Sequence, residues 1–446
     1  MNVHPPDRVE AVVEAFAARF GRRAEVVVRA PGRVNLIGEH TDYNGLPVLP
    51  MAIDRNVLVA AAGRGDRRVR VENADARFAP RAYQLQAGIR RFAAGDWGNY
   101  HKAAAQGLLS ALGPDVLGGG DFLIDGDVPT AAGLSSSSAL VVGSALALLA
   151  INQRSLPPPQ LAELTAATER YVGTQSGGMD QAVCLLAQAG QALRIDFDPL
   201  RTRAVAVPAG YSFVVCHSLV EAEKSGATRA VYNTRVAECR LACRVIERLL
   251  GASLPRPLAG LGELRRLFSD RSLPDFVAIL DSALPPRPLR IEEIAALVGT
   301  PREHLTAAIG ASAPANATYA IVKRARHVFT EAARVDDAEA ALAAGDWLAL
   351  STLMDASHAS CRDDYEVSSP TLEELIAAAK AAGAAGARLT GAGFGGCTIN
   401  LVPNRDASFF LAMIERSFYQ QKPAAQRRRE HCFVVAPSAG ASVTRL

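Results

Sequence analysis

The densest group of residues that could carry chemistry is Gly133 followed by the serine run Ser135–Ser138. The apolar segment 121–125 precedes it with the pattern of a strand, and the apolar segment 139–151 follows it at helical length. The start of a helix presents unpaired backbone N–H groups and the positive end of the helix dipole. Glycine lets an anion approach the backbone, and serine hydroxyls add donors or a metal ligand. The stretch alone predicts, with equal weight, a phosphate cradle or a serine-rich cap on a buried helix.

A second polar group lies between two strand-like segments near the N-terminus. Arg33, Glu39, His40 and Asp42 fall within the segment 33–42, which is unusual for an ordinary loop. Polar groups between buried strands need hydrogen-bond partners. The segment therefore indicates a binding site for a polar ligand.

The glycine loop 391–396 matches the dinucleotide-binding pattern GxGxxG letter for letter. That pattern requires a following helix and an acidic residue about twenty positions later. Here the segment 397–402 alternates like a strand, and no well-placed acid follows. No GxxxxGK[ST] sequence exists in the chain. We therefore expect a loop between two strands that closely approaches another element or a phosphate.

The composition is that of a soluble globular protein with two domains. The chain has 446 residues, of which 49% are hydrophobic and 21% charged, and its net charge of +3 gives no basic field for nucleic acid. We interpret the basic cluster Arg427–Arg429 as a solvated loop. Seven dispersed cysteines suit reduced thiols in a cytoplasmic protein. The apolar run after the serines is too short to cross a membrane.

Periodicity predicts a mixed first half and a helix-rich second half, each with strands. Helices are expected at 7–20, after Trp97, and at 139–151, 159–171, 177–190, 224–250, 320–334, 337–355 and 371–382. Strands are expected at 25–29, 48–53, 57–62, 68–72, 121–125, 193–197, 211–217, 388–389, 397–402 and 432–435. Pro31–Gly32 should end the first strand.

Three blocks of the chain resemble the three signature motifs of the GHMP kinases. They are 31–48, 129–139 with its Gly–Leu–Ser–Ser–Ser core, and 389–397. The first block is similar to the galactokinase signature, which other members of the family lack. Further matches at 325–331 and 363–367 extend the resemblance over nearly the whole chain.

This resemblance implies an α+β fold of two domains. Residues 1–205 would form a domain like ribosomal protein S5 domain 2, and residues 206–446 a ferredoxin-like, helix-rich domain that includes the glycine loop. The implied reaction is ATP-dependent phosphorylation of the C1 hydroxyl of a galactose-type sugar, with Mg²⁺ and with the site between the domains. We expect a monomer whose partners are the sugar and ATP, without nucleic acid or membrane.

The resemblance also implies roles for particular residues. Asp180 matches the catalytic aspartate, and Arg33 matches the arginine beside it. Phosphoryl transfer needs positioning and charge compensation, which such a pair supplies. The remaining matches are sugar contacts (Glu39, His40, Asp42, Gly177 and Tyr232), the phosphate and magnesium loop (Gly133, Ser135, Ser136, Ser137 and Ser138), an adenine contact (Trp97) and magnesium ligands (Ser137 and Glu169).

Some alternatives stay open at this point. Without the resemblance, Trp97 would be a core residue and Tyr232 an ordinary aromatic on a helix. The segments 173–180 and 233–241 are more similar to N-acetylgalactosamine kinase, whereas Thr41, Asn44 and Tyr232 favour galactose. We therefore expect galactose, with N-acetylgalactosamine second. A non-catalytic sensor of galactose and ATP is disfavoured, because the serine run and Asp180 are intact.

Overall fold

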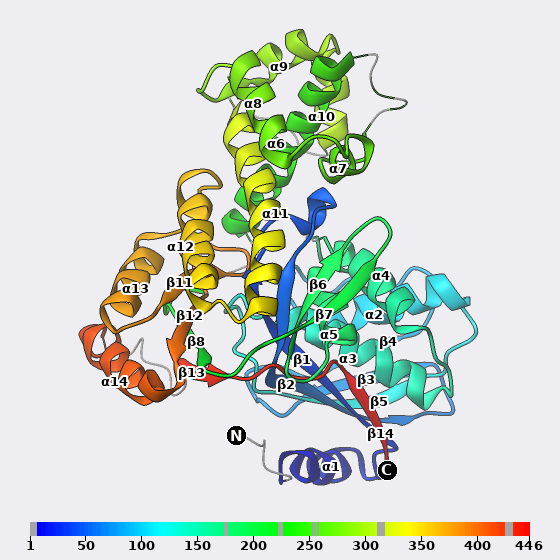
Figure 1. Ribbon diagram of the computed structural model, residues 1–446. Helices are drawn as coiled ribbons and strands as arrows, with labels where there is room; N and C mark the ends of the chain where they lie inside the picture. The colour runs from blue at the N-terminus through cyan, green and yellow to red at the C-terminus, as the bar shows by residue number, and fades with distance from the viewer. Residues whose placement is uncertain are drawn as a thin grey trace.

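The computed structural model describes residues 7–173, 177–221, 226–251, 254, 256, 258–309, 317–423 and 431–446. Two β-sheets with their covering helices form the lower part of the view in Figure 1, and a group of helices stands above them. The basic cluster Arg427–Arg429 lies outside the described residues. So do residues 174–176 of the segment 173–180, which was compared with N-acetylgalactosamine kinase above. Within the described ranges, every helix is too short or too polar to span a bilayer.

The first sheet has six strands in the order β14-β1-β2-β5-β3-β4. All neighbours are antiparallel except β3 and β5. The strands are β1 (Val26–Ile37), β2 (Leu49–Gly63), β3 (Arg68–Asn73), β4 (Arg81–Gln84), β5 (Gly120–Gly126) and β14 (Ser442–Arg445). The last strand of the chain thus pairs with the first. A domain boundary at 205/206 remains a prediction, and it would separate β14 from the sheet that contains it.

Two of the predicted strand ends are wrong. β1 continues through Pro31–Gly32, and β2 joins the two segments that periodicity separates at residues 54–56. The pairing of β1 with β2 shifts register between Pro31 and Arg33, and such an irregularity lets a strand accommodate a proline. Arg33 therefore lies in a strand of a sheet and not in a loop.

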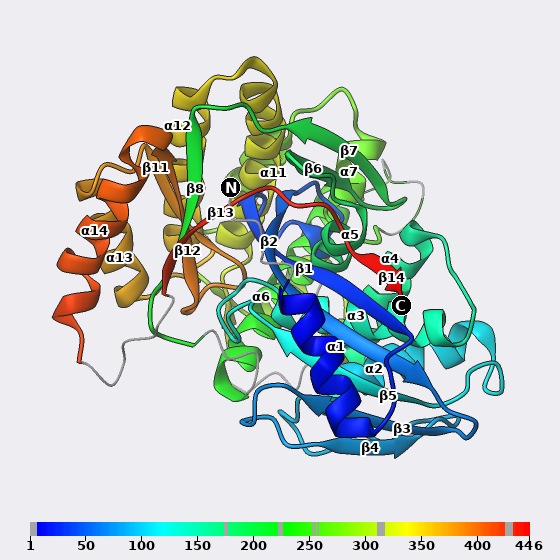
Figure 2. The same ribbon diagram turned by 90° about the horizontal axis from the view of Figure 1, so that it is seen from below.

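The first sheet is covered on both faces. Val27 faces α1 (Asp7–Phe20), whereas Val26 and Val28 face the core shared with α2 (Gly98–Leu112) and α3 (Ser136–Ile151). Figure 2 shows α1 lying across the sheet. Because successive side chains of a strand point to opposite faces, a strand buried on both sides needs an unbroken apolar run. That explains the three consecutive valines.

Beside this sheet lie α4 (Pro158–Glu169), α5 (Met179–Leu186) and a hairpin of β6 (Gln191–Asp196) and β7 (Arg201–Ala206). α4 packs against α2 and α5, and α5 also packs against α3 and β1. Helix α5 ends four residues before the predicted end at Gly190. Its first turn carries Asp180, the predicted catalytic aspartate.

The second sheet has four antiparallel strands in the order β11-β12-β8-β13. These are β8 (Tyr211–His217), β11 (Gly386–Thr390), β12 (Cys397–Pro403) and β13 (Cys432–Val435). Its covering helices are α12 (Trp347–Asp363), α13 (Pro370–Ala381) and α14 (Ala407–Ser417). The glycine loop connects β11 to β12, as the sequence predicts.

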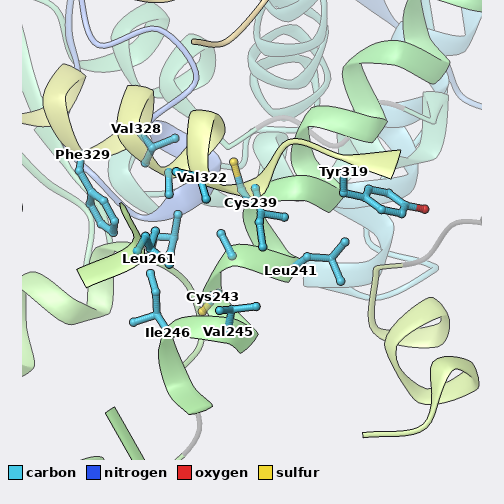
Figure 3. Packing of buried hydrophobic residues seen from close by; sticks show 14 of the residues in the cluster. Cys239, Leu241, Cys243, Val245, Ile246, Leu261, Tyr319, Val322, Val328 and Phe329 are labelled. Carbon is cyan, nitrogen blue, oxygen red and sulfur yellow. The ribbon is translucent and has the colours of Figure 1, made fainter. Parts of the chain in front are cut away.

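The group of helices consists of α6 (Gly226–Leu250), α7 (Gly262–Leu267), α8 (Leu273–Ala283), α9 (Ile291–Val298) and α10 (Arg302–Ile309). Helix α11 (Ile321–Ala344) packs against α6 and α8 and extends to β1 and α12 (Figure 1). Figure 3 shows Val328 and Phe329 of α11 in one buried cluster with Cys239 and Ile246 of α6. The predicted break near 335 is wrong, because α11 continues to Ala344 and is capped by Gly345, which adopts a left-handed φ of 67°.

Two neighbouring phenylalanines on α14 test the packing on the second sheet. Phe410 is fully buried, whereas 63% of Phe409 is exposed. We expect Phe410→Ala to lower the free energy of unfolding by about 3–5 kcal/mol, because it leaves a cavity. The matched change Phe409→Ala should alter it by less than about 0.5 kcal/mol. Urea unfolding measures both, and equal losses would contradict the packing described here.

Candidate active site

A cavity of about 700 Å³ lies where the first sheet, the helical group and the glycine loop meet. It contains most of the residues that the sequence singled out. These lining residues are Arg33, Glu39, His40, Asp42, Trp97, Gly133, Ser135, Ser136, Ser137, Asp180 and Tyr232. Residues from distant parts of the chain therefore form one site.

The centre of the site is a buried ion pair between β1 and α5. Nε and Nη2 of Arg33 both lie 2.8 Å from Oδ1 of Asp180. Asp180 stands in the first turn of α5, where the helix dipole favours a negative charge. Arg33 also donates through Nη1 to the carbonyl oxygen of Gly133, at 2.5 Å. One guanidinium thus joins the aspartate to the serine-containing loop.

The loop before α3 has the form of an anion site. Its last residue before the helix, Ser135, adopts a left-handed conformation with φ of 60° and makes no side-chain cap. The Oγ of Ser135 is buried and has no partner. Ser136 and Ser137 stand at the start of the helix and line the cavity. The first N–H groups of α3 are available to a ligand, which favours the phosphate cradle over the helix cap.

The glycine loop is in contact with the serine-containing loop. A Cβ atom on Gly391 would lie 2.5 Å from the carbonyl oxygen of Gly133, so only glycine allows this approach. The N–H of Gly391 donates to Oε1 of Glu39 at 2.7 Å. The glycine loop is therefore tied both to the phosphate cradle and to the polar turn that follows β1.

The polar turn 38–44 presents two carboxyl groups and an imidazole to the cavity, besides the phenol of Tyr43. Burial raises the pKa of Glu39, and Arg388 partly offsets this effect. Burial and the nearby His327 lower the pKa of His40 well below its ordinary value, so its imidazole is neutral. Burial and the charge of Asp180 raise the pKa of Asp42 to about 6. Closely spaced groups with shifted pKa values are typical of functional sites.

Aromatic side chains form two walls of the cavity. Tyr232 of α6 lies beside His40, with ring centroids 5.7 Å apart. Trp97 borders the cavity, donates its indole N–H to the carbonyl oxygen of Ala79 and contacts the Phe78 ring edge-to-face. Both residues are partly exposed towards the cavity.

Three predicted site residues do not line the cavity. A Cβ atom on Gly177 would lie 2.3 Å from the backbone nitrogen of Tyr43, so this glycine permits a close approach of two backbones. Ser138 and Glu169 are buried behind the cradle, and the Ser138 hydroxyl donates to Oε1 of Glu169 at 2.6 Å. The same hydroxyl lies 3.4 Å from Oδ2 of Asp180.

The donors around the cradle fit a magnesium ion that also binds phosphate. Mg²⁺ takes few protein ligands beside a nucleotide and prefers hydroxyl and carboxylate oxygens. Ser137 offers a hydroxyl to the cavity, and the Glu169 carboxylate lies behind it. Among the described residues, no group of three or more His, Cys, Asp or Glu side chains forms a metal cage. Such a site would need ligand oxygens from the nucleotide.

Sequence reasoning missed other residues of the site. Tyr43, Phe78, Tyr100 and Leu140 line the cavity. Tyr43 lies within the first signature block, which was the signal that could have identified it. The other three carry no local pattern, since they resemble ordinary core residues. Behind the cavity, the buried Arg388 approaches Oε1 of Glu39 at 3.5 Å.

Comparison with protein families gives three matches along the chain. Residues 14–63 match the galactokinase galactose-binding signature. Residues 99–188 match the GHMP kinases N terminal domain, and residues 338–420 match the GHMP kinases C terminal model. A galactokinase of Dictyostelium discoideum is 34% identical, over 98% of this chain and 94% of that protein. The chain belongs to the galactokinase family of GHMP kinases.

Other relatives agree with this membership. A galactokinase of Chloroflexus aggregans is 39% identical, over 91% of this chain and 90% of that protein. The crystal structure of Lactococcus lactis galactokinase complexed with galactose superposes with a TM-score of 0.76 at 30% identity, covering 98% of this chain and 100% of that one. Methanococcus jannaschii mevalonate kinase shares the fold, with a TM-score of 0.55 at 16% identity over 93% and 99%.

Two glycines with the same φ test the contact between the glycine loop and the serine-containing loop. Gly133 and Gly190 both have φ of 76°, but a Cβ atom on Gly133 would lie 2.8 Å from the carbonyl oxygen of Thr390, whereas Gly190 has open space. Gly190→Ala should cost only the backbone strain, about 1 kcal/mol. We expect Gly133→Ala to lose more stability and to weaken nucleotide binding at least tenfold. Thermal unfolding and titration with a non-hydrolysable ATP analogue measure these effects. Nucleotide affinity that is equal in the two variants would argue against the loop contact.

Proposed function

We propose that the protein is a galactokinase, which transfers the γ-phosphoryl group of ATP to the C1 hydroxyl of galactose. The observation that carries this proposal is the ion pair of Arg33 and Asp180, which lies in one cavity with both the polar turn and the phosphate cradle. The galactose-binding signature and the relatives named galactokinase support the choice of sugar.

Asp180 is the proposed base. During transfer a bond forms between the C1 oxygen and the γ-phosphorus, the bond from that phosphorus to the bridging oxygen of ADP breaks, and the hydroxyl proton passes to Asp180. An aspartate is a weak base, which suffices when the transition state is loose and the proton leaves late. Arg33 orients the Asp180 carboxylate through their ion pair and compensates charge on the transferring group.

The polar turn is the proposed sugar site. Sugar hydroxyls can both donate and accept, so a neutral imidazole and carboxylates suit them. Glu39, His40 and Asp42 supply these groups, Tyr232 covers the sugar, and Gly177 leaves room for the backbone beside Asp42. A site with such fixed partners discriminates strongly between a sugar that carries the matching hydroxyl groups and an analogue that lacks them.

The cradle and the rim beside Trp97 are the proposed nucleotide site. Gly133 and Ser135 lie just before α3, and Ser136, Ser137 and Ser138 form its first turn, where N–H groups and the helix dipole attract phosphate. Trp97 lines the cavity beside Phe78, which supports it as the proposed contact of the adenine. We assign Ser137 and Glu169 as the residues that would hold Mg²⁺, which would neutralise charge on the phosphates. Ser138 orients the Glu169 carboxylate.

The deciding experiment is a coupled assay of ADP release with galactose, N-acetylgalactosamine, glucose and arabinose. We expect galactose to give the highest kcat/KM. A preference for N-acetylgalactosamine would instead favour an N-acetylgalactosamine kinase, the enzyme to which the segment 233–241 is more similar. Binding of galactose and ATP with no turnover of any sugar would favour a sensor.

The same assay tests the base. Asp180→Asn should lower kcat with galactose by about 10²–10⁴-fold, because the proton acceptor is lost while Arg33 keeps a neutral partner. Galactose binding, followed by calorimetry, should change little. Turnover close to that of the wild type in this variant would eliminate Asp180 as the base.

The raised pKa of Asp42 predicts a pH dependence of sugar binding. The carboxyl group has a pKa of about 6, so it is ionised at pH 7 and protonated at pH 5. If only the ionised form binds well, the Kd for galactose should rise about tenfold between pH 7 and pH 5. Calorimetry across this range measures it. In the Asp42→Asn variant this group cannot titrate, so the Kd for galactose should not depend on pH in this range. If the variant keeps the pH dependence of the wild type, another group is the cause.

A further inference from the structure

The turn that carries Glu39 and His40 has a strained backbone. His40 adopts a left-handed φ of 65°, and Gly38 a φ of 107°. A non-glycine residue in this region costs on the order of 1–3 kcal/mol and persists only when its surroundings hold it. Within the turn, the Thr41 hydroxyl donates to the carbonyl oxygen of Gly38, and the Asn44 amide donates to that of His40. The peptide groups around Glu39 need partners from elsewhere.

Helix α11 supplies those partners. Oε1 of Glu331 accepts hydrogen bonds from the N–H groups of Gly38 at 2.8 Å and Glu39 at 3.2 Å. Nε2 of His327 lies 3.0 Å from the carbonyl oxygen of Glu39. His327 and Glu331 are four residues apart, so they lie on one face of the helix, and both are fully buried. Glu331 therefore binds the backbone N–H of Glu39, and His327 binds its backbone carbonyl oxygen.

The same face of α11 also fixes how closely the turn packs against the helix. Val335 continues the face, and a Cβ atom on Gly38 would lie 3.0 Å from its Cγ2 atom and 2.8 Å from the Cα atom of Val48. Gly38 is therefore packed tightly between α11 and Val48, the residue that precedes β2. Neither His327 nor Glu331 lines the cavity. Both residues reach the cavity through the turn that carries Glu39 and His40.

The protonation states of the two residues follow from their partners. Burial lowers the pKa of His327 to about 4, so the ring is neutral. Because a carbonyl only accepts, Nε2 carries the proton and Nδ1 accepts from the Ser360 hydroxyl at 2.9 Å. Although burial opposes it, the positive charges of Arg334 and Arg388 hold the pKa of Glu331 well below its ordinary value. An ionised acceptor and a neutral donor are thus both in place at neutral pH.

We propose that His327 and Glu331 are positioning residues that hold the turn 38–41 in the shape that binds the sugar. The proposal rests on the proposed galactokinase function, because it assigns the turn to the sugar. The two residues act first on sugar affinity, because they contact the turn directly. The nucleotide side is affected less, because it is joined to the turn through the hydrogen bond between Glu39 and Gly391. They do not touch either substrate.

Two substitutions at one position separate positioning from mere packing. His327→Leu removes the donor and leaves the buried carbonyl of Glu39 without a partner, whereas His327→Gln retains an N–H donor of similar reach. We expect the leucine variant to raise KM for galactose about tenfold. KM for ATP should stay within about twofold and kcat within about threefold. The glutamine variant should lie within about threefold of the wild type in all three constants.

A parallel increase of both KM values, or equal effects of the two variants, would overturn the proposal. Wild-type protein that turns over no galactose would refute the proposed function without testing the positioning. Hydrogen exchange of the peptide containing residues 38–44 covers that case and also a leucine variant with low stability, because it needs no substrate. Exchange at the turn should be faster in His327→Leu than in His327→Gln. Equal exchange rates in the two variants would overturn the positioning role.

Discussion

The buried ion pair of Arg33 and Asp180 is the contact on which the rest of the site depends. It joins β1 of the first sheet to the start of α5, and the third guanidinium nitrogen reaches the carbonyl oxygen of Gly133 in the proposed phosphate cradle. Burying two charges is costly unless they are paired and hydrogen-bonded. Loss of either partner would leave an uncompensated charge in the protein. The same contact therefore holds three elements together, and in the proposed mechanism it would supply both the base and the cation.

Glu39 plays a comparable part in joining the elements around the cavity. Its carboxylate accepts from the N–H of Gly391, and Gly391 lies against Gly133. The proposed sugar and phosphate sites thus share one framework of short contacts, with α11 behind the turn and the glycine loop between the two sites. A GHMP kinase must align a hydroxyl with a γ-phosphate, and fixed contacts of this kind reduce the entropy that the alignment costs.

Much of the secondary structure could be predicted from local pattern. The bounds of α1 agree with the apolar spacing and the following glycine, and β5, β8 and β12 agree with short apolar runs. The errors arose where pairing with a neighbouring strand outweighed the local sequence signal. Pro31–Gly32 suggested a break, but pairing with β2 continues across it through a register shift. β14 has four exposed residues and no apolar pattern, and it is a strand because β1 offers it an edge.

The residue types and motifs alone specified the family, the serine-containing helix start and the aspartate at the beginning of α5. These features depend on groups close together in the chain, where spacing has a direct structural meaning. Which groups meet across the fold was settled by packing. Arg33 and Asp180 are 147 residues apart, and Glu39 and Gly391 are 352 apart. The burial of Glu169 behind Ser138 and the hold of His327 and Glu331 on the turn likewise follow from the way distant elements pack. Periodicity carries no information about such contacts, because it describes which face of an element is buried and not what lies against it.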